Sequence, residues 1–256
     1  MADTIIYMEG VTVTFSGFKA LNDVSFYVEK GELRFLIGPN GAGKTTLLDV
    51  ICGKVRPDKG RVIFKDKVEI PRLGEHKIAR AGISRKFQTP SVFSNLTVFE
   101  NMELALKTNT GVFSSLVHSI SKKEREHINS VLQDVGLYEK ASEKAGHLSH
   151  GEKQWLEIAM TVLQEPELLL VDEPVAGMTA KERIKTGELL LTIASQRSVI
   201  VVEHDMDFVQ RFSKKVTVLH EGQVICEGSF EYVKNDPVVI DVYLGRGGEV
   251  QNNAIN

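Results

Sequence analysis

The segment GPNGAGKTT, residues 38 to 46, constrains this chain more than any other feature of its sequence. It fits the pattern G-x-x-x-x-G-K-[ST], follows the apolar run RFLIG (34–38), and precedes a helix predicted from Lys44 to about Cys52. Glycines here let the backbone fold closely around a phosphate, and the helix N-terminus adds positive potential. The pattern therefore predicts a phosphate-binding loop, the alternative being a glycine-rich turn that merely joins a strand to a helix.

Two residues of this loop have separate expected roles. Lys44 would neutralise the outer phosphates of a nucleotide, and the Thr45 hydroxyl would bind Mg²⁺. The residues expected to contact the nucleotide are Gly38, Pro39, Asn40, Gly41, Ala42, Gly43, Lys44, Thr45 and Thr46.

The segment LLLVDEP, residues 168 to 174, ends an apolar strand in two adjacent acids. Burying a carboxylate is costly unless something compensates for it, and a Mg²⁺ ion beside Asp172 would do so. Glu173 could then polarise a water for attack on the γ-phosphate. Acids exposed at a strand end are the alternative, which the neighbouring phosphate loop disfavours.

His204, in VVEHDM, ends another apolar strand (198–203), and Gln88, in RKFQTP, follows the short strand 82–84. Because the ends of parallel strands meet at one edge of a sheet, we expect Asp172, Glu173 and His204 to share one site. A lone histidine or a loop glutamine, taken by itself, is more often structural or solvated.

An aromatic residue near the phosphate loop could stack on a nucleobase. Phe15 is the candidate, Phe18 is its competitor, and a strand residue facing a core is the alternative for either.

The segment LSHGEKQ, residues 148 to 154, has the capping-box pattern S-x-x-E between Ser149 and Glu152. The same pattern occurs at Thr97 and at Ser121, so ordinary helix capping explains it well. Whether Ser149 and Gly151 also hold something negative is a question that the segment alone leaves open.

The order of elements indicates an α/β protein with a mostly parallel core sheet. Apolar strands alternate with helices after residue 166, whereas 1–30 and 61–70 are typical of antiparallel hairpins and 90–165 is helical. We expect a single domain whose core and antiparallel β subdomain comprise 1–89 and 166–244. Within it, 90–165 would be an inserted helical subdomain, and 245–256 a flexible tail.

Composition excludes several classes of protein. The 256 residues carry a formal net charge of −3, which gives no general attraction to nucleic acid. The two cysteines, Cys52 and Cys226, form no disulfide framework and suit a reducing compartment. There is no signal peptide and no apolar run of about 18 residues, so we expect a cytoplasmic chain that would reach a membrane only through another protein.

Taken in order, six motifs resemble those of the ATP-binding subunit of ABC transporters. They are the aromatic Phe15, the Walker A loop (38–46), the Q-loop residue Gln88, the signature LSHGE (148–152), Walker B (168–173) and the H-loop residue His204. The resemblance implies a P-loop ABC ATPase that binds ATP and Mg²⁺ and closes head-to-tail with another ATPase subunit, identical or different.

The same resemblance implies roles for the site residues. Ser149 would offer its hydroxyl, and Gly151 its N–H, to the γ-phosphate bound by the partner subunit. Glu173 would be the general base, His204 would hold the γ-phosphate and the attacking water, and Gln88 would contact Mg²⁺ and sense the membrane subunit.

Several shorter segments resemble those of ATPases of branched-chain amino acid importers. Within that group the urea-type subunit is the most similar, particularly through PVAGMT (174–179). This implies an ATPase that powers uptake of urea or short amides with two membrane permeases and, indirectly, an extracytoplasmic solute-binding protein. The alternatives are a branched-chain amino acid importer, a lipid or lipopolysaccharide exporter, and a soluble ATPase acting on ribosomes or nucleic acid. The last usually has two cassettes or a long coiled-coil insert, which this chain lacks.

The sequence departs from the family pattern at three positions. His150 replaces a glycine and Glu152 a glutamine of the usual LSGGQ, and Thr179 stands where an aspartate is usual. We expect the His150 side chain to point away from ATP and Glu152 to turn back into the helix cap. Thr179 is left outside the catalytic set.

Overall fold

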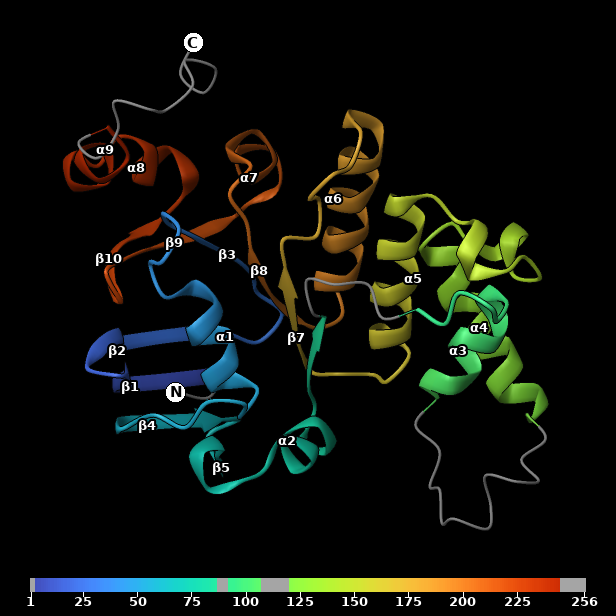
Figure 1. The fold of residues 1–256 in the computed structure, drawn as a ribbon, viewed down its shortest axis with the longest axis horizontal. Helices are drawn as coiled ribbons and strands as arrows, with labels where there is room; N and C mark the ends of the chain where they lie inside the picture. Colours follow the sequence, from blue (N-terminus) through green and yellow to red (C-terminus); the bar gives the residue numbers. More distant parts are fainter. Residues whose placement is uncertain (1–2, 87–91, 107–119, 245–256) are drawn as a thin grey trace.

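A parallel sheet forms the centre of the computed structural model, which describes residues 3–86, 92–106 and 120–244 (Figure 1). Its strand order is β10-β9-β3-β8-β7-β6; β10 runs antiparallel to β9, and the other neighbouring pairs are parallel. The strands are β3 (Leu33–Ile37), β6 (Ile83–Lys86), β7 (Leu168–Asp172), β8 (Ser198–Val202), β9 (Lys215–His220) and β10 (Gln223–Gly228). The predicted α/β fold with a mostly parallel core sheet is confirmed.

A second, antiparallel sheet has the order β2-β1-β4-β5. Its strands are β1 (Thr4–Phe15), β2 (Phe18–Glu29), β4 (Lys59–Phe64) and β5 (Val68–Glu69). Both hairpins expected from the sequence are present, and β1 and β2 are longer than the β-branched runs alone indicated.

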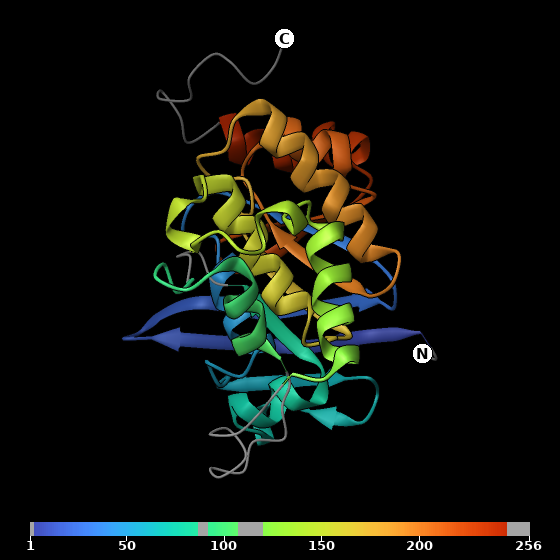
Figure 2. The ribbon, with the colours of Figure 1, turned by 90° about the vertical axis from the view of Figure 1, so that its right-hand side faces the viewer.

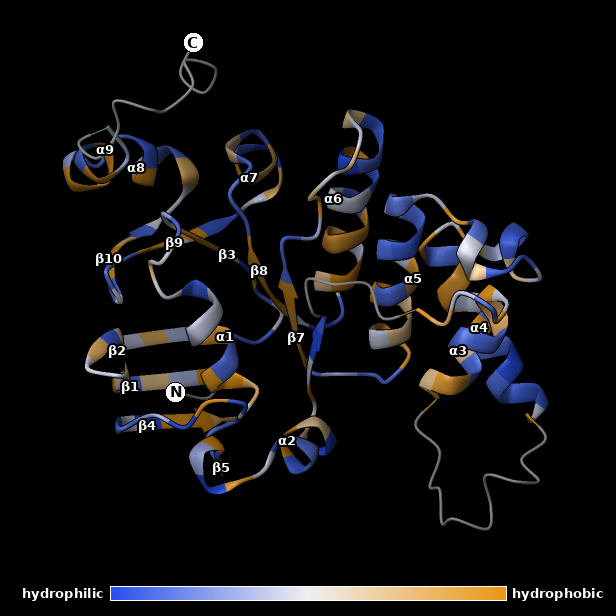
Figure 3. Ribbon diagram, in the orientation of Figure 1, coloured by the Kyte–Doolittle hydropathy of each residue, from blue (hydrophilic) through white to orange (hydrophobic). Residues whose placement is uncertain are grey.

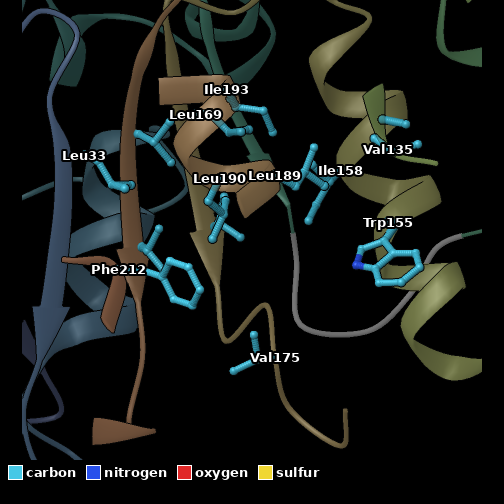
Figure 4. Packing of buried hydrophobic residues seen from close by; sticks show 14 of the residues in the cluster. Leu33, Val135, Trp155, Ile158, Leu169, Val175, Leu189, Leu190, Ile193 and Phe212 are labelled. Atoms are coloured by element: carbon cyan, nitrogen blue, oxygen red, sulfur yellow. The ribbon is translucent and has the colours of Figure 1, made fainter. Parts of the chain in front are cut away.

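Every residue of β3, β7 and β8 is buried, because layers cover both faces of the parallel sheet (Figure 3). Alternate residues of these strands enter two different cores. Leu169 and Val171 belong to a core with helices α3 to α7, shown in part in Figure 4, whereas Leu168 and Leu170 face α1 and the antiparallel sheet. The near-continuous apolar strands that the sequence shows are what such two-sided burial requires.

The helices connect and cover these sheets (Figure 2). Their bounds are α1 (Lys44–Ile51), α2 (Glu75–Ala81), α3 (Val98–Ala105), α4 (Lys122–Asp134), α5 (His150–Val162), α6 (Ala180–Ala194), α7 (Met206–Phe212), α8 (Phe230–Lys234) and α9 (Pro237–Leu244). Capping boxes begin α3, α4 and α5 at the three predicted residues. A fourth box, at Thr179 with Glu182, begins α6; the T-x-x-E pattern was present in the sequence and was missed.

The division into a core with a β subdomain, a helical subdomain and a tail remains a prediction. Residues 245–256 lie outside the described residues. In the three described ranges, no helix combines the length and the apolarity needed to cross a membrane.

Candidate active site

The loop 38–43 connects the end of β3 to the start of α1, as the phosphate-loop pattern predicts. Gly38 has φ +149°, and a Cβ built there would lie 2.1 Å from the Leu219 carbonyl oxygen. Gly43 has φ +102°, and its Cβ would lie 2.5 Å from the Ala20 oxygen. No other residue fits at these two positions without moving backbone, so the glycines are required by the neighbouring strands as well as by any phosphate.

Lys44 is buried at the start of α1 and turns back over the loop. Its Nζ donates hydrogen bonds to the carbonyl oxygens of Gly38 (2.7 Å) and Pro39 (3.0 Å). Burial lowers the pKa of the Lys44 ammonium, and the carboxylates of Glu173 and Asp172 oppose that shift. The loop thus encloses a cation beside the two Walker B acids, as an anionic ligand would need.

Asp172 ends β7 with only 1% of its surface exposed. Its Oδ2 accepts a hydrogen bond of 3.0 Å from Nη2 of Arg85, whose Nη1 pairs with Asp49. Burial raises the pKa of the Asp172 carboxyl, against the influence of Arg85. Arg85 begins the segment RKFQTP, yet only the pairing of β6 with β7 reveals this contact.

The other carboxylate oxygen of Asp172, Oδ1, is buried and has no hydrogen-bond partner within the described residues. Buried polar atoms are rarely left in this state, so the atom indicates a ligand. Among the residues described, no group of three or more His, Cys, Asp and Glu side chains could enclose a cation. Mg²⁺ is usually held by only one or two protein oxygens, with water and phosphate completing its shell, so Asp172 together with the exposed Thr45 fits this ion.

Glu173 and His204 lie together, as the convergence of strand ends predicts. The distance from Glu173 Oε1 to His204 Nδ1 is 3.5 Å, and both side chains are partly exposed. Glu173 has φ +47°, which is uncommon for a residue with a side chain, and its N–H donates to the Val202 oxygen at 2.9 Å. The turn places Glu173 directly after β7, at the sheet edge where β3 also runs into the phosphate loop.

Two predicted contacts, stacking on the base and the Gln88 contact with Mg²⁺, are not settled by the described residues. Phe15 and Phe18 pair across β1 and β2, and both rings are exposed, at 49% and 65%. The structure therefore does not choose between the two for stacking on a base. Gln88 lies outside the described residues.

The start of α5 forms the predicted capping box. Glu152 N donates to Ser149 Oγ (3.2 Å), and Ser149 N donates to Glu152 Oε2 (3.0 Å). The other Glu152 oxygen pairs with Lys140 Nζ at 2.8 Å, and although burial raises the pKa of Glu152, these contacts lower it overall. Glu152, which replaces the usual glutamine, therefore turns back into the helix cap, as expected from the sequence.

The start of α5 also contacts the segment that follows β7 in the same chain. His150 Nε2 lies 3.1 Å from the Ala176 carbonyl oxygen. Ser149 Oγ donates to Glu182 Oε1 at 3.3 Å, and a Cβ on Gly151 would lie 2.5 Å from the same oxygen. Close packing on α6 is therefore a reason for glycine at 151 that sequence reasoning missed.

Thr179 caps α6, and this role predicts the effect of substitutions there. Thr179→Ala should lower the free energy of unfolding by about 1 kcal/mol, whereas Thr179→Asp should nearly preserve it, because aspartate is an equally good N-cap. Urea denaturation checks both. Thr192→Ala is the control, since the hydroxyl of this threonine donates to the Glu188 oxygen within the same helix and caps no helix end. Wild-type stability in Thr179→Ala would contradict the capping role.

Comparison with known proteins places these features in a family. The family model described as "ABC transporter" matches residues 21–176. The chain is 37% identical to the high-affinity branched-chain amino acid transport ATP-binding protein BraF of Pseudomonas aeruginosa, with 96% of the chain and 99% of the relative covered. It is 34% identical to LivG, the ATP-binding protein of the same description from Escherichia coli, with the same coverage.

Solved structures agree with these relatives. The ADP conformation of MJ1267, an ATP-binding cassette of an ABC transporter, superposes with a TM-score of 0.83 at 31% identity, covering 94% of this chain and 99% of that one. The dimeric structure of MJ0796, a bacterial ABC transporter cassette, superposes with a TM-score of 0.74 at 26% identity, covering 88% and 99%.

Proposed function

This chain belongs to the ABC transporter family, as an ATP-binding subunit of the branched-chain amino acid importer type, and we propose that its ATP hydrolysis powers the import of a small polar solute. One observation carries the proposal. Lys44 lies buried over the phosphate loop, where Glu173 and Asp172 oppose the lowering of its pKa by burial, and Glu173 lies 3.5 Å from His204. A cation for phosphate, an acid for a metal and a carboxylate free to act as a base thus meet at one edge of the sheet.

Binding of ATP is the task of the loop and of the residues around it. The backbone N–H groups of residues 40–46 and the Lys44 ammonium hold the phosphates, and Phe15 or Phe18 stacks on the base. Thr45 and Asp172 would hold Mg²⁺, with Gln88 as a further ligand. When bound, Mg²⁺ neutralises charge on the phosphates.

Hydrolysis requires a base beside the terminal phosphate. Glu173 accepts a proton from the attacking water, and its partly exposed carboxylate leaves room for that water. His204 Nδ1, 3.5 Å from this carboxylate, orients the water and contacts the phosphate.

The active assembly is a head-to-tail dimer with a second copy or with another ATPase subunit. The dimeric structure of the MJ0796 cassette supports a dimer, and the head-to-tail orientation is part of the proposal. Ser149 and Gly151 stand at the N-terminus of α5, whose amide dipoles favour a phosphate of the partner's ATP. Two permeases bind the ATPase pair at the inner face of the plasma membrane, an extracytoplasmic binding protein delivers the solute, and nucleic acid has no part.

The solute is the finer part of the proposal. The relatives BraF and LivG are described as branched-chain amino acid transport proteins, so we place these amino acids first. This reverses the order expected from the sequence, which put urea first. Urea remains the second candidate because of the residues PVAGMT after β7, and the descriptions of the relatives support neither an exporter nor a ribosome-bound ATPase.

Uptake by the assembled transporter tests this function. The chain, co-purified with its permeases and binding protein and reconstituted in vesicles containing ATP, should import labelled leucine; labelled urea is the competing substrate. The same complex with Glu173→Gln is the control and should import neither. Uptake of urea but not of leucine would make urea the solute in place of the branched-chain amino acids. Co-purification with ribosomes in place of permeases would overturn the transport role.

A further inference from the structure

Glu203 is a buried carboxylate that the roles above do not use. It directly follows β8, has 1% of its surface exposed, and its N–H points to the Leu36 oxygen of β3 at 3.3 Å. It therefore links β8 to His204 and lies beside β3, the strand that ends in the phosphate loop. Burying a carboxylate costs more free energy than burying an apolar residue, unless hydrogen bonds compensate for the lost hydration.

The carboxylate accepts backbone hydrogen bonds from two different loops. Oε1 accepts from Val175 N at 3.2 Å, in the segment that follows Glu173. Oε2 accepts from His204 N (3.0 Å) and from Asp205 N (3.3 Å). One side chain thus joins the loop of the general base to the loop of the histidine.

These bonds bear on the geometry of the catalytic pair. The Glu173 N–H already donates to the Val202 oxygen, so the ends of β7 and β8 are joined by one backbone bond and by the Glu203 carboxylate. Asp205 extends the link, because its side chain pairs with Arg183 and caps α7 through Phe208 N. Glu173 itself is held in a left-handed conformation that a loosened loop would be free to relax.

The buried Glu203 carboxylate has a positively charged neighbour. Lys86, at the end of β6, is buried and pairs with Glu157 of α5 at 3.7 Å, and Glu203 is among the carboxylates that oppose the lowering of the Lys86 pKa by burial. Burial raises the pKa of the Glu203 carboxyl, while the three N–H donors act against that shift. A carboxylate offers an acceptor to each loop, which a neutral amide cannot do.

We propose that Glu203 is a positioning residue that sets the separation and orientation of Glu173 and His204 by bonding the backbones of both loops. This inference rests on the proposed ATPase function, because it assigns a task within that site. Glu203 touches no reacting atom, and its effect reaches the chemistry through the two side chains that it holds.

Glu203→Gln is the direct test, since its single acceptor oxygen can serve only one loop and its NH₂ group would face the N–H of the other. Steady-state hydrolysis should show kcat lowered by about 10- to 100-fold, as expected when catalytic groups move by about an ångström. KM for ATP and the affinity of the isolated subunit for ATP should stay within about threefold, since the phosphate loop is untouched.

Ser198→Ala is the matched control for lost stability. Ser198 is equally buried, lies at the opposite end of β8, and accepts one hydrogen bond from Gly31 N at 3.0 Å. It should lower the melting temperature, as Glu203→Gln does, with kcat unchanged. Glu203→Asp, one methylene shorter, is the second variant and should also lose kcat, because it cannot reach both loops.

Three results would overturn the proposal. They are wild-type kcat in a folded Glu203 variant, an equal loss of kcat in Ser198→Ala, and failure of both Glu203 variants to fold, which would make the residue a requirement for folding alone. Absence of hydrolysis by the wild-type chain with its permeases would count against the ATPase function instead.

Discussion

Glu173→Gln is expected to lower ATP turnover by roughly 10²- to 10⁴-fold, the usual contribution of a general base. ATP binding should survive, because the phosphate loop and Lys44 are unchanged and glutamine has the size of glutamate. Without hydrolysis to open it, the ATP-bound dimer should accumulate. Phosphate release and size-exclusion chromatography in the presence of ATP measure the two effects.

A matched control separates loss of the base from strain in the turn. Glu165 is also a glutamate with positive φ, +51°, and it lies before β7, at the opposite end of that strand from Glu173. Glu165→Gln should therefore leave turnover within about twofold, as remote surface substitutions generally do. Turnover near that of the wild type in Glu173→Gln would defeat the assignment of the base.

Ser149→Arg is expected to abolish hydrolysis while the isolated subunit still binds ATP with nearly unchanged affinity. The reason is that α5 lies apart from α1 and the phosphate loop of its own chain, across β7 and β8 (Figure 1). An arginine at the start of α5 would instead block the surface offered to the partner's ATP. Titration of ATP into the isolated subunit, followed by a hydrolysis assay, measures both properties.

Ser121→Arg is the control for the lost cap. Ser121 begins α4 with the same capping box, so both substitutions should cost about 1 kcal/mol of stability. Only the change at Ser149 should stop hydrolysis. Loss of ATP binding by the Ser149→Arg monomer would show that α5 faces its own nucleotide, which would refute the placement.

Local patterns and strand order predicted much of the site. The phosphate loop follows from its spacing, and the meeting of Glu173 with His204 follows because parallel strands end at one edge. The capping box at Ser149 also follows from local sequence, because its partner is only three residues away.

What sequence reasoning missed depends on contacts between distant segments. The bonds of Glu203 to Val175 and of Arg85 to Asp172 join residues 28 and 87 positions apart, and no local pattern encodes them. The box at Thr179 was missed although its pattern is local. Its contact with the start of α5 through Glu182 appears only once α5 and α6 pack together.

The central claim, that each ATP is held by the phosphate loop of one copy and the α5 start of another, can be measured with a mixed dimer. One chain carries Ser149→Arg and the other Lys44→Ala, and two different affinity tags isolate the mixed species. Neither variant alone should hydrolyse ATP. In the mixed dimer, one site combines an intact loop with an intact α5 start, so hydrolysis should return. A purified mixed dimer as inactive as both parents would contradict the shared site.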